Sequence, residues 1–258
     1  MRSPLGRRAL SLQPSATIAV DARAKALIAS GVDVVNLTAG EPDFPTPAVP
    51  SKAGQDAIAE GFTRYTAVAG IAELRSAIAT KLREDNGLEY RPEQVVVSNG
   101  AKQSVYNALM VLLDPGDEVV IPFPAWVSYP EMVRLADGVP VMVDTEPAGY
   151  RLDPTLLAAA ITPRTQAIII NSPSNPTDAV NINEELRAVA KLSHDNAHYA
   201  TSDPIYEHVI HTPQPLNPAP TRSEILARTI TVNGFSKAYA MTGWRMGYAA
   251  AAPVLAEA

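Results

Sequence analysis

The chain has 258 residues, of which 47% are hydrophobic and 19% are charged, and this is enough apolar sequence for a large buried core. Its net charge of -6 argues against a nucleic-acid-binding protein, because the phosphate backbone must be met by clustered Lys and Arg. The sequence has no cysteine, which excludes disulfides, thiolate catalysis and zinc held by cysteine.

The N-terminal part of the sequence differs from the rest. Residues 1–20 are basic but are interrupted by prolines and have no apolar core, so they make a poor signal peptide. No stretch has the about 18 uninterrupted apolar residues that a membrane helix needs, and we therefore expect a cytoplasmic protein. Residues 14–31 predict a helix that ends at Gly31, and residues 34–47 predict a short strand that runs into a Pro-rich loop. We expect residues 1–51 to form an N-terminal arm and part of a small domain.

From residue 94 onward, short apolar runs alternate with helical patterns. The runs lack polar alternation, which is typical of strands buried on both faces of a parallel sheet. The sequence therefore predicts an α/β fold for residues 52–258, with a seven-stranded, mostly parallel sheet covered by helices. The predicted strands are 94–100, 118–124, 139–143, 167–173, 198–206, 229–235 and 246–250, and predicted helices include 101–113, 128–136, 153–160 and 183–192.

Polar and small residues gather where these predicted strands end. They are found at 98–100, at Asn171, at Asp203 and at 233–234. In open α/β sheets, ligands bind at the carboxyl edge of the strands. Lys237 follows the strand after Asp203, so we expect the two side chains to lie close together at that edge.

Four kinds of group are expected at this edge. Lys237 can form an imine, Asp203 supplies a carboxylate, Arg245 supplies a guanidinium, and residues 98–104 supply the N–H groups of a helix start. Pyridoxal phosphate has an aldehyde, a pyridine nitrogen, a phenolate and a phosphate, and it would match all four. In this interpretation Lys237 forms the Schiff base, Asp203 pairs with the ring N–H, and Arg245 binds the phosphate through two hydrogen bonds.

Three further side chains fit the same cofactor. Tyr206 and Asn175 would donate to the ring oxygen, and Trp126 would stack on the ring face.

The stretch "NGFSKAYAMTGWRMG" (233–247) resembles the lysine signature of class-I pyridoxal-phosphate aminotransferases, in the aspartate aminotransferase family. Residues 37–44, 65–75, 98–104, 171–177 and 202–206 also resemble blocks of that family, in its order, so the resemblance runs over nearly all of the chain. It implies the large domain of a fold-type I transferase. It also implies biosynthetic amino-acid metabolism, with an amino group moved between an aspartate-like L-amino acid and a 2-oxo acid.

The resemblance also implies roles for individual residues. Lys237 and Asp203 match the catalytic lysine and the residue that pairs with the ring nitrogen, and Tyr65 matches a tyrosine that reaches the phosphate of the neighbouring subunit of a homodimer. Cofactor contacts are implied at Tyr65, Gly100, Ala101, Lys102, Trp126, Asn175, Asp203, Tyr206, Ser236, Lys237 and Arg245, and substrate contacts at Gly40, Trp126 and Asn175.

The sequence departs from the family in three places. Asp178 replaces the glycine usual after Asn-Pro-Thr, which predicts a strained turn. Gln13 replaces a lysine linked to acidic side chains, so aromatic amino acids or prephenate join aspartate and 2-oxoglutarate as candidate substrates. The family also continues beyond Ala258 with the rest of a small domain and the arginine for the substrate α-carboxylate. We therefore expect residues 1–258 to bind cofactor but to turn over amino acids negligibly.

Other functions remain open at this point. A pyridoxal-phosphate lyase or decarboxylase could use the same fold, and a non-catalytic remnant could retain cofactor binding. A dinucleotide-binding enzyme is disfavoured, because no G-x-G-x-x-G opens a helix after the first predicted strand. We expect no metal site: His194 and His198 are four residues apart, but no acidic third ligand follows, and a solvated helix face is favoured.

Overall fold

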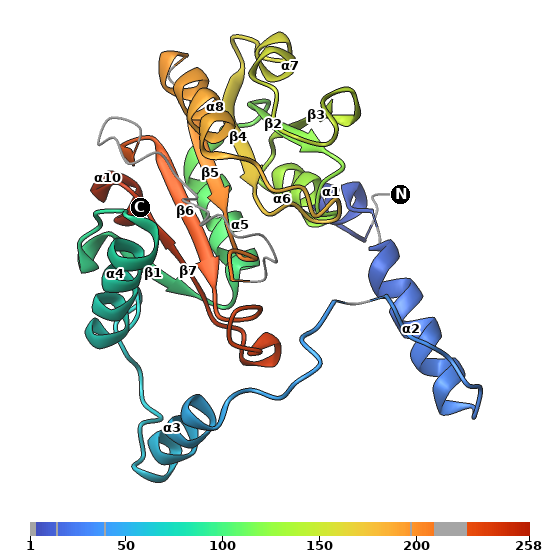
Figure 1. Ribbon diagram of the computed structural model, residues 1–258, viewed down its shortest axis with the longest axis vertical. Helices are drawn as coiled ribbons and strands as arrows, with labels where there is room; N and C mark the ends of the chain where they lie inside the picture. Colours follow the sequence, from blue (N-terminus) through green and yellow to red (C-terminus); the bar gives the residue numbers. More distant parts are fainter. Residues whose placement is uncertain (1–3, 14, 39, 197, 209–225) are drawn as a thin grey trace.

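The computed structural model describes residues 4–13, 15–38, 40–196, 198–208 and 226–258. One seven-stranded sheet forms its centre, in the order β1-β7-β6-β5-β4-β2-β3, and Figure 1 shows helices on both of its faces. All neighbouring strands are parallel except β7, which is antiparallel to both β1 and β6. This confirms the predicted mostly parallel sheet. The strands are β1 (Val95–Ser98), β2 (Glu118–Phe123), β3 (Val139–Asp144), β4 (Thr165–Asn171), β5 (Tyr199–Asp203), β6 (Thr229–Gly234) and β7 (Gly247–Ala250).

Side chains of alternate strand residues point to opposite faces of the sheet, and each face has its own helices. Val119 and Ile121 of β2 pack with α5 and α6, whereas Val120 packs with α7 and α8. A further cluster on the second face joins α4 to β1 and β7. These helices are α4 (Ala72–Asn86), α5 (Ala101–Leu112), α6 (Ser128–Leu135), α7 (Pro154–Ala159) and α8 (Asn183–Asp195).

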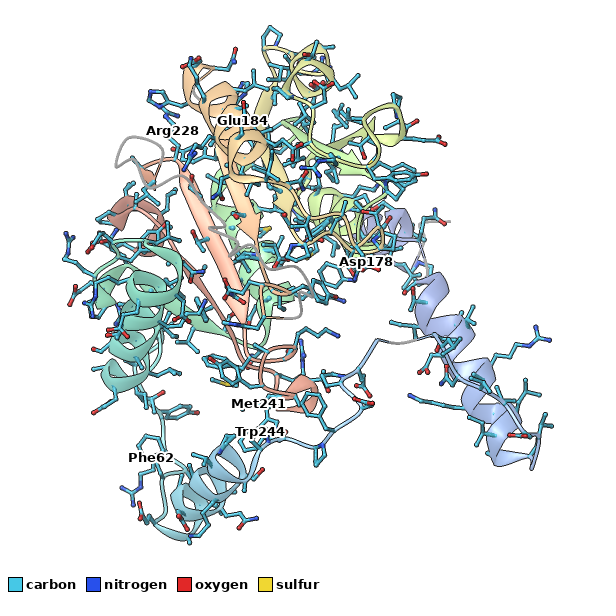
Figure 2. All side chains as sticks on the ribbon, in the orientation of Figure 1. Phe62, Asp178, Glu184, Arg228, Met241 and Trp244 are labelled. Carbon is cyan, nitrogen blue, oxygen red and sulfur yellow. The ribbon has the colours of Figure 1, made fainter. Side chains whose placement is uncertain are left out.

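The remaining elements lie outside these layers. Figure 1 shows α2 and α3 away from the sheet, joined by a long extended segment. Trp244 lies against α3, because a Cβ added to Gly54 would be 2.9 Å from its ring, and Figure 2 shows Trp244 beside this helix. These elements are α1 (Arg7–Ser11), α2 (Ala16–Ala29), α3 (Ala48–Ala59), α10 (Pro253–Ala256) and the short 3-10 turns η1 (Pro92–Gln94), η2 (Glu146–Ala148) and η3 (Thr242–Trp244).

Two expectations from the sequence are wrong. The predicted strand after residue 34 does not form, because no described strand lies beside this segment to pair with it, and Val35 and Leu37 are 83% and 89% exposed. His198 does not share a solvated face with His194: α8 ends at Asp195, and His198 lies buried before β5. Burial lowers the pKa of His198, and the nearby Arg228 lowers it further.

The carboxyl edge of the sheet positions the residues of interest. Asn171 and Asp203 are direct neighbours across β4 and β5, and Gly234 pairs with Gly247 across β6 and β7. Lys237 follows three residues after the end of β6, so it lies at the same edge as Asp203. The prediction that the two side chains share this edge is confirmed. None of the described helices is long and apolar enough to cross a membrane.

The packing of α5 on the sheet generates a stability prediction. Leu109 is fully buried in the cluster formed with β2, β4 and β6, so Leu109→Ala should lower the free energy of unfolding by about 2–5 kcal/mol. Leu37→Ala is the matched control, because Leu37 is 89% exposed and its loss should change stability by less than about 0.5 kcal/mol. Urea unfolding curves measure both, and equal losses for the two variants would contradict the placement of α5.

Candidate active site

Asp203, the last residue of β5, is the most buried charged group at the carboxyl edge. It is 3% exposed, and its Oδ2 accepts a hydrogen bond of 2.7 Å from the Tyr129 hydroxyl. Its Oδ1 is buried and has no hydrogen-bond partner among the described residues. Burial raises the pKa of Asp203 to about 6, and the bond from Tyr129 opposes that rise. The unused oxygen can therefore accept a proton-bearing group of a ligand.

Tyr129 was not among the predicted site residues. It lies on the first turn of α6, three residues after Trp126, and the two rings meet edge to face at 5.3 Å. Burial raises the pKa of Tyr129 well above its usual value, so the hydroxyl stays protonated and donates to Asp203. Trp126 precedes α6, so no helical spacing connected the two residues in the sequence, and Tyr129 gave no signal of its own.

Asn171, Asn175 and Tyr206 form a chain of hydrogen bonds beside Asp203. The Asn171 amide donates to the Asp203 carbonyl at 2.8 Å, and its oxygen accepts from the Asn175 N–H at 2.8 Å. The Asn175 side-chain amide then donates to the Tyr206 hydroxyl at 3.0 Å. The two predicted ring-oxygen donors are thus already in contact, and Asn171, predicted only as an edge residue, positions both Asp203 and Asn175.

The turn after Asn175 contains Asp178, the departure from the family noted above. Asp178 has a φ of +56°, in the left-handed region that favours glycine. Its N–H donates to the Ser174 carbonyl at 3.0 Å, which closes the turn. Asp178 therefore takes up the left-handed conformation in the turn that the sequence predicted to be strained.

Lys237 approaches the site from the turn after β6. Its ammonium donates to the Gly40 carbonyl and lies 5.9 Å from the centre of the Tyr206 ring. Burial lowers the pKa of Lys237 and Arg245 lowers it further, while Glu41 acts in the opposite direction. A lowered pKa increases the fraction of neutral amine, which is the nucleophilic form.

A cradle for an anion lies at the start of α5. Gly100 has a φ of +84°, and a Cβ at this position would lie 2.3 Å from the Arg245 guanidinium. A Cβ on Gly247 would lie 2.3 Å from the backbone nitrogen of Ala101, so glycine is required on both sides. The first N–H groups of a helix have no partner within the helix and attract anions. Arg245 is therefore held against a helix start, as the phosphate interpretation predicts.

The charges around this cradle also favour an anion. Burial lowers the pKa of Lys102, and the positive charge of Arg245 lowers it further. Arg245 acts in the same way on Lys237, so both lysines feel the positive charge of Arg245. The Lys102 ammonium lies 4.9 Å from the Trp126 ring centre. A bound phosphate would relieve the repulsion among these cations.

The segment before α3, which contains Gly40 and Thr46, contacts the turn that carries Lys237. The Thr46 hydroxyl donates to the Ala240 carbonyl at 2.6 Å and accepts from the Trp244 ring N–H at 3.2 Å. With the Lys237–Gly40 bond, these contacts place Gly40 in the site, while Ser236 is buried beneath the turn. Tyr65 is fully exposed between α3 and α4, and no described residue of the site contacts it.

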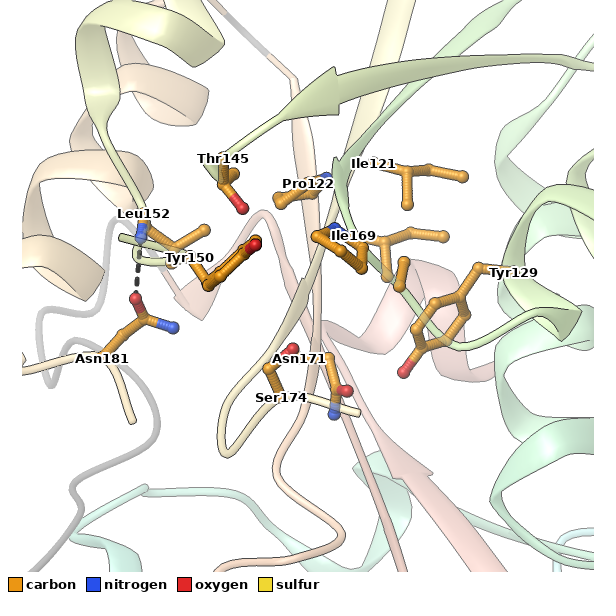
Figure 3. Close-up of a pocket in the computed structure, with 12 residues that line it drawn as sticks. Ile121, Pro122, Tyr129, Thr145, Tyr150, Leu152, Ile169, Asn171, Ser174 and Asn181 are labelled. Atoms are coloured by element: carbon orange, nitrogen blue, oxygen red, sulfur yellow. Dashed lines mark hydrogen bonds between the residues drawn. The ribbon is translucent and has the colours of Figure 1, made fainter. Parts of the chain in front are cut away.

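A small pocket lies behind Asn171 and Tyr129 and is shown in Figure 3. Its volume is about 20 Å³, enough for a single water molecule and far below the roughly 300 Å³ of a small-molecule site. Its far wall is fixed by the bond from the Leu152 N–H to the Asn181 side-chain oxygen, at 2.8 Å. The open edge around Lys237, and not this pocket, is therefore the candidate active site.

The raised pKa of Asp203 generates a prediction about pH. The ordinary pKa of an aspartate is 3.8, and that of Asp203 in the folded chain is about 6. At pH values between these two, Asp203 holds a proton in the folded chain that it has released in the unfolded chain. The free energy of unfolding should therefore fall as the pH rises through this range. The full difference between the two pKa values corresponds to about 3 kcal/mol in the free energy of unfolding. Asp203→Asn should remove this contribution, so the stability difference between the variant and the original chain should change between pH 4 and 6. Urea unfolding without cofactor measures it, and parallel pH profiles would contradict the assignment.

Comparison with known proteins agrees with this geometry. The family model described as aminotransferase class I and II matches residues 32–258. A probable aspartate/prephenate aminotransferase of Thermus aquaticus is 52% identical over 246 residues, which cover 95% of this chain and 63% of the relative. A bifunctional aspartate aminotransferase and glutamate/aspartate-prephenate aminotransferase of Petunia hybrida is 50% identical, with coverage of 95% and 52%.

Solved structures give the same result. The aspartate aminotransferase of Thermus thermophilus, solved with maleate, superimposes with a TM-score of 0.94 at 48% identity, over 100% of this chain and 66% of that one. The chain thus spans a little under two thirds of the length of these Thermus relatives. With its sheet, its lysine turn and the match over residues 32–258, the chain belongs to the class I and II aminotransferase family.

Proposed function

We propose that this chain carries the cofactor site of a pyridoxal-phosphate-dependent aminotransferase, which transfers an amino group between an L-amino acid and a 2-oxo acid. The observation that carries the proposal is the juxtaposition of two groups at one sheet edge. The Lys237 amine has a lowered pKa, and the buried Asp203 carboxylate has one oxygen without a partner among the described residues.

The residues present fit pyridoxal phosphate at each of its polar groups. The Asp203 Oδ1 atom would accept the ring N–H, and the pair of Asn175 and Tyr206 would hold the ring oxygen. The phosphate would be bound by Arg245 and the start of α5, where Gly100 leaves room that a Cβ would fill. Ala101, Lys102, Ser236 and Trp126 complete the proposed cofactor contacts.

The chemistry divides between the cofactor and the chain. When bound, pyridoxal phosphate supplies an aldehyde for the amine of the substrate and a protonated ring that accepts the electron pair left at Cα. The Lys237 amine would act as the base that takes the Cα proton of the substrate and holds it for transfer. Asp203 would keep the ring nitrogen protonated, and Tyr129 keeps Asp203 oriented.

An acidic substrate is the preferred choice. The names of the relatives support aspartate as amino donor and prephenate as acceptor, and maleate in the Thermus thermophilus structure is a four-carbon dicarboxylate. The resemblance to the family adds 2-oxoglutarate as an acceptor. Gly40, Trp126 and Asn175 would contact the substrate. Gly40 lies within reach because its carbonyl accepts from Lys237.

The proposal extends to assembly and location. A cytoplasmic homodimer is proposed, in which Tyr65 reaches the phosphate in the neighbouring subunit; its full exposure supports a role outside its own chain. We also propose that residues 1–51 belong to an arm and small domain and residues 52–258 to the cofactor domain. This boundary falls within α3, which lies apart from the sheet (Figure 1).

Lys237→Ala tests the proposed lysine directly. Pyridoxal phosphate added to the unmodified chain should give the visible absorbance of a lysine-bound cofactor, and the variant should lose this absorbance because the amine proposed to bind the aldehyde is removed. Lys52→Ala is the control, since Lys52 is exposed on α3 and pairs with Asp56 of the same helix. An unchanged visible band in Lys237→Ala would refute the assignment.

Turnover by residues 1–258 alone is expected to be very slow. The resemblance places the arginine for the substrate α-carboxylate beyond residue 258, and losing such a charged pair costs about 1.5–3 kcal/mol. Poor alignment of the Cα–H bond adds to this, because alignment supplies up to about 7–11 kcal/mol of a barrier. Conversion of aspartate should therefore be at least about 100-fold slower than in a chain extended to the family's length. Comparable rates would contradict this prediction.

A further inference from the structure

Glu207, directly after Tyr206, is a buried carboxylate that the proposed reaction does not use. Its side chain is 5% exposed and accepts hydrogen bonds from three others. The Lys81 ammonium and the Asn233 amide donate to Oε1, the latter at 2.8 Å, and the Asn86 amide donates to Oε2 at 2.6 Å. We call Lys81, Asn86, Glu207 and Asn233 the Glu207 cluster.

The cluster connects three elements that meet at the active site. Lys81 and Asn86 lie on α4, and Lys81 also donates to the Asn86 side-chain oxygen at 2.7 Å. Asn233 lies near the end of β6, and its side-chain oxygen accepts from the Gly234 N–H at 2.7 Å. Gly234 begins the turn that carries Lys237. The cluster therefore joins the residue after Tyr206 to the start of the lysine turn.

Direct backbone pairing between β5 and β6 stops before this part of the structure. The ladder between β5 and β6 pairs Ala200 with Thr229 and ends with Ser202 opposite Thr231. Beyond that point, the segments that carry Tyr206 and Lys237 leave the ladder. The bond between Glu207 and Asn233 joins them again, two residues after the last strand pair on β6. The Glu207–Asn233 bond is therefore a side-chain link between two segments that no longer pair directly with each other through their backbones.

We propose that Glu207 is a positioning residue, which holds Tyr206 and the turn of Lys237 at the separation that cofactor binding requires. This inference rests on the proposed function. A buried carboxylate is costly unless its hydrogen bonds are satisfied, and here three donors satisfy it from two other elements. Loss of the charge would also leave Lys81, which is 18% exposed, without its buried partner.

The chain provides a matched control in Glu118. Its side chain is also 5% exposed and also pairs with a cation, since Arg164 and Thr162 donate to it. It lies at the start of β2, at the opposite edge of the sheet from Lys237. A general loss of stability should therefore be common to Glu118 and Glu207 variants, while an effect on the cofactor should belong to Glu207 alone.

The test measures pyridoxal phosphate bound to the 258-residue chain, by its dissociation constant and by its visible circular dichroism, which reports how firmly the ring is oriented. Glu207→Gln should weaken binding about tenfold, as expected for one charged hydrogen bond, and should reduce the circular dichroism per bound cofactor. Asn233→Ala should do the same with the Lys81–Glu207 pair left in place. Glu118→Gln should retain both readings despite a similar loss of thermal stability.

Several results would overturn the proposal. One is a Glu207→Gln chain whose affinity and circular dichroism equal those of Glu118→Gln. If Glu207→Gln does not fold, Asn233→Ala decides, and unchanged readings in that variant contradict the proposal. If the unmodified chain itself gives no visible band with pyridoxal phosphate, the proposed function fails and this inference fails with it. The two failures can be told apart. If only the inference about Glu207 is wrong, the unmodified chain gives the visible band, and the Glu207 and Asn233 variants bind the cofactor as well as it does.

Discussion

The site depends on one carboxylate that is buried at the end of a central strand. Asp203 sits between β4 and β6, and its two oxygens have different surroundings: one accepts from Tyr129, and the other has no partner among the described residues. Burial disfavours the charged form of this carboxyl group, which is why its pKa rises to about 6. A ligand that brings a positively charged N–H to Oδ1 would remove this cost. Relief of the desolvation cost of Asp203 would thus contribute part of the binding energy of that ligand.

The sheet topology explains why the other groups converge on this carboxylate. Parallel strands end at one edge, so Asn171 and Asp203 are neighbours, and the next segment returns Lys237 to the same place. The antiparallel strand β7 then runs back into the sheet, which puts Arg245 beside the start of α5. Glycine at 100 and 247 permits the close contacts there. Cations that repel one another are held together by this backbone arrangement.

The sequence predicted the seven strands and most of the site because both leave local signals. Buried parallel strands are uninterrupted apolar runs, and the lysine turn has a dense pattern of small residues around Lys237 and Arg245. Tyr129 and Glu207 were missed, because a tyrosine on an amphipathic helix and an acidic residue in a loop have no pattern of their own. Their roles come from contacts with residues 74 and 126 positions away, at Asp203 and Lys81. The strand predicted after residue 34 failed for the related reason that pairing depends on a partner which the local sequence does not specify.

The central claim is that Asp203 holds a protonated pyridine nitrogen at the sheet edge. Pyridoxal phosphate labelled with 15N in the ring tests it directly, because the nitrogen chemical shift distinguishes the protonated from the neutral ring. Bound to the 258-residue chain at pH 8, the ring nitrogen should give the signal of the protonated form, and Asp203→Ala should give that of the neutral form. A neutral ring in the unmodified chain, or a protonated ring in the variant, would contradict the account.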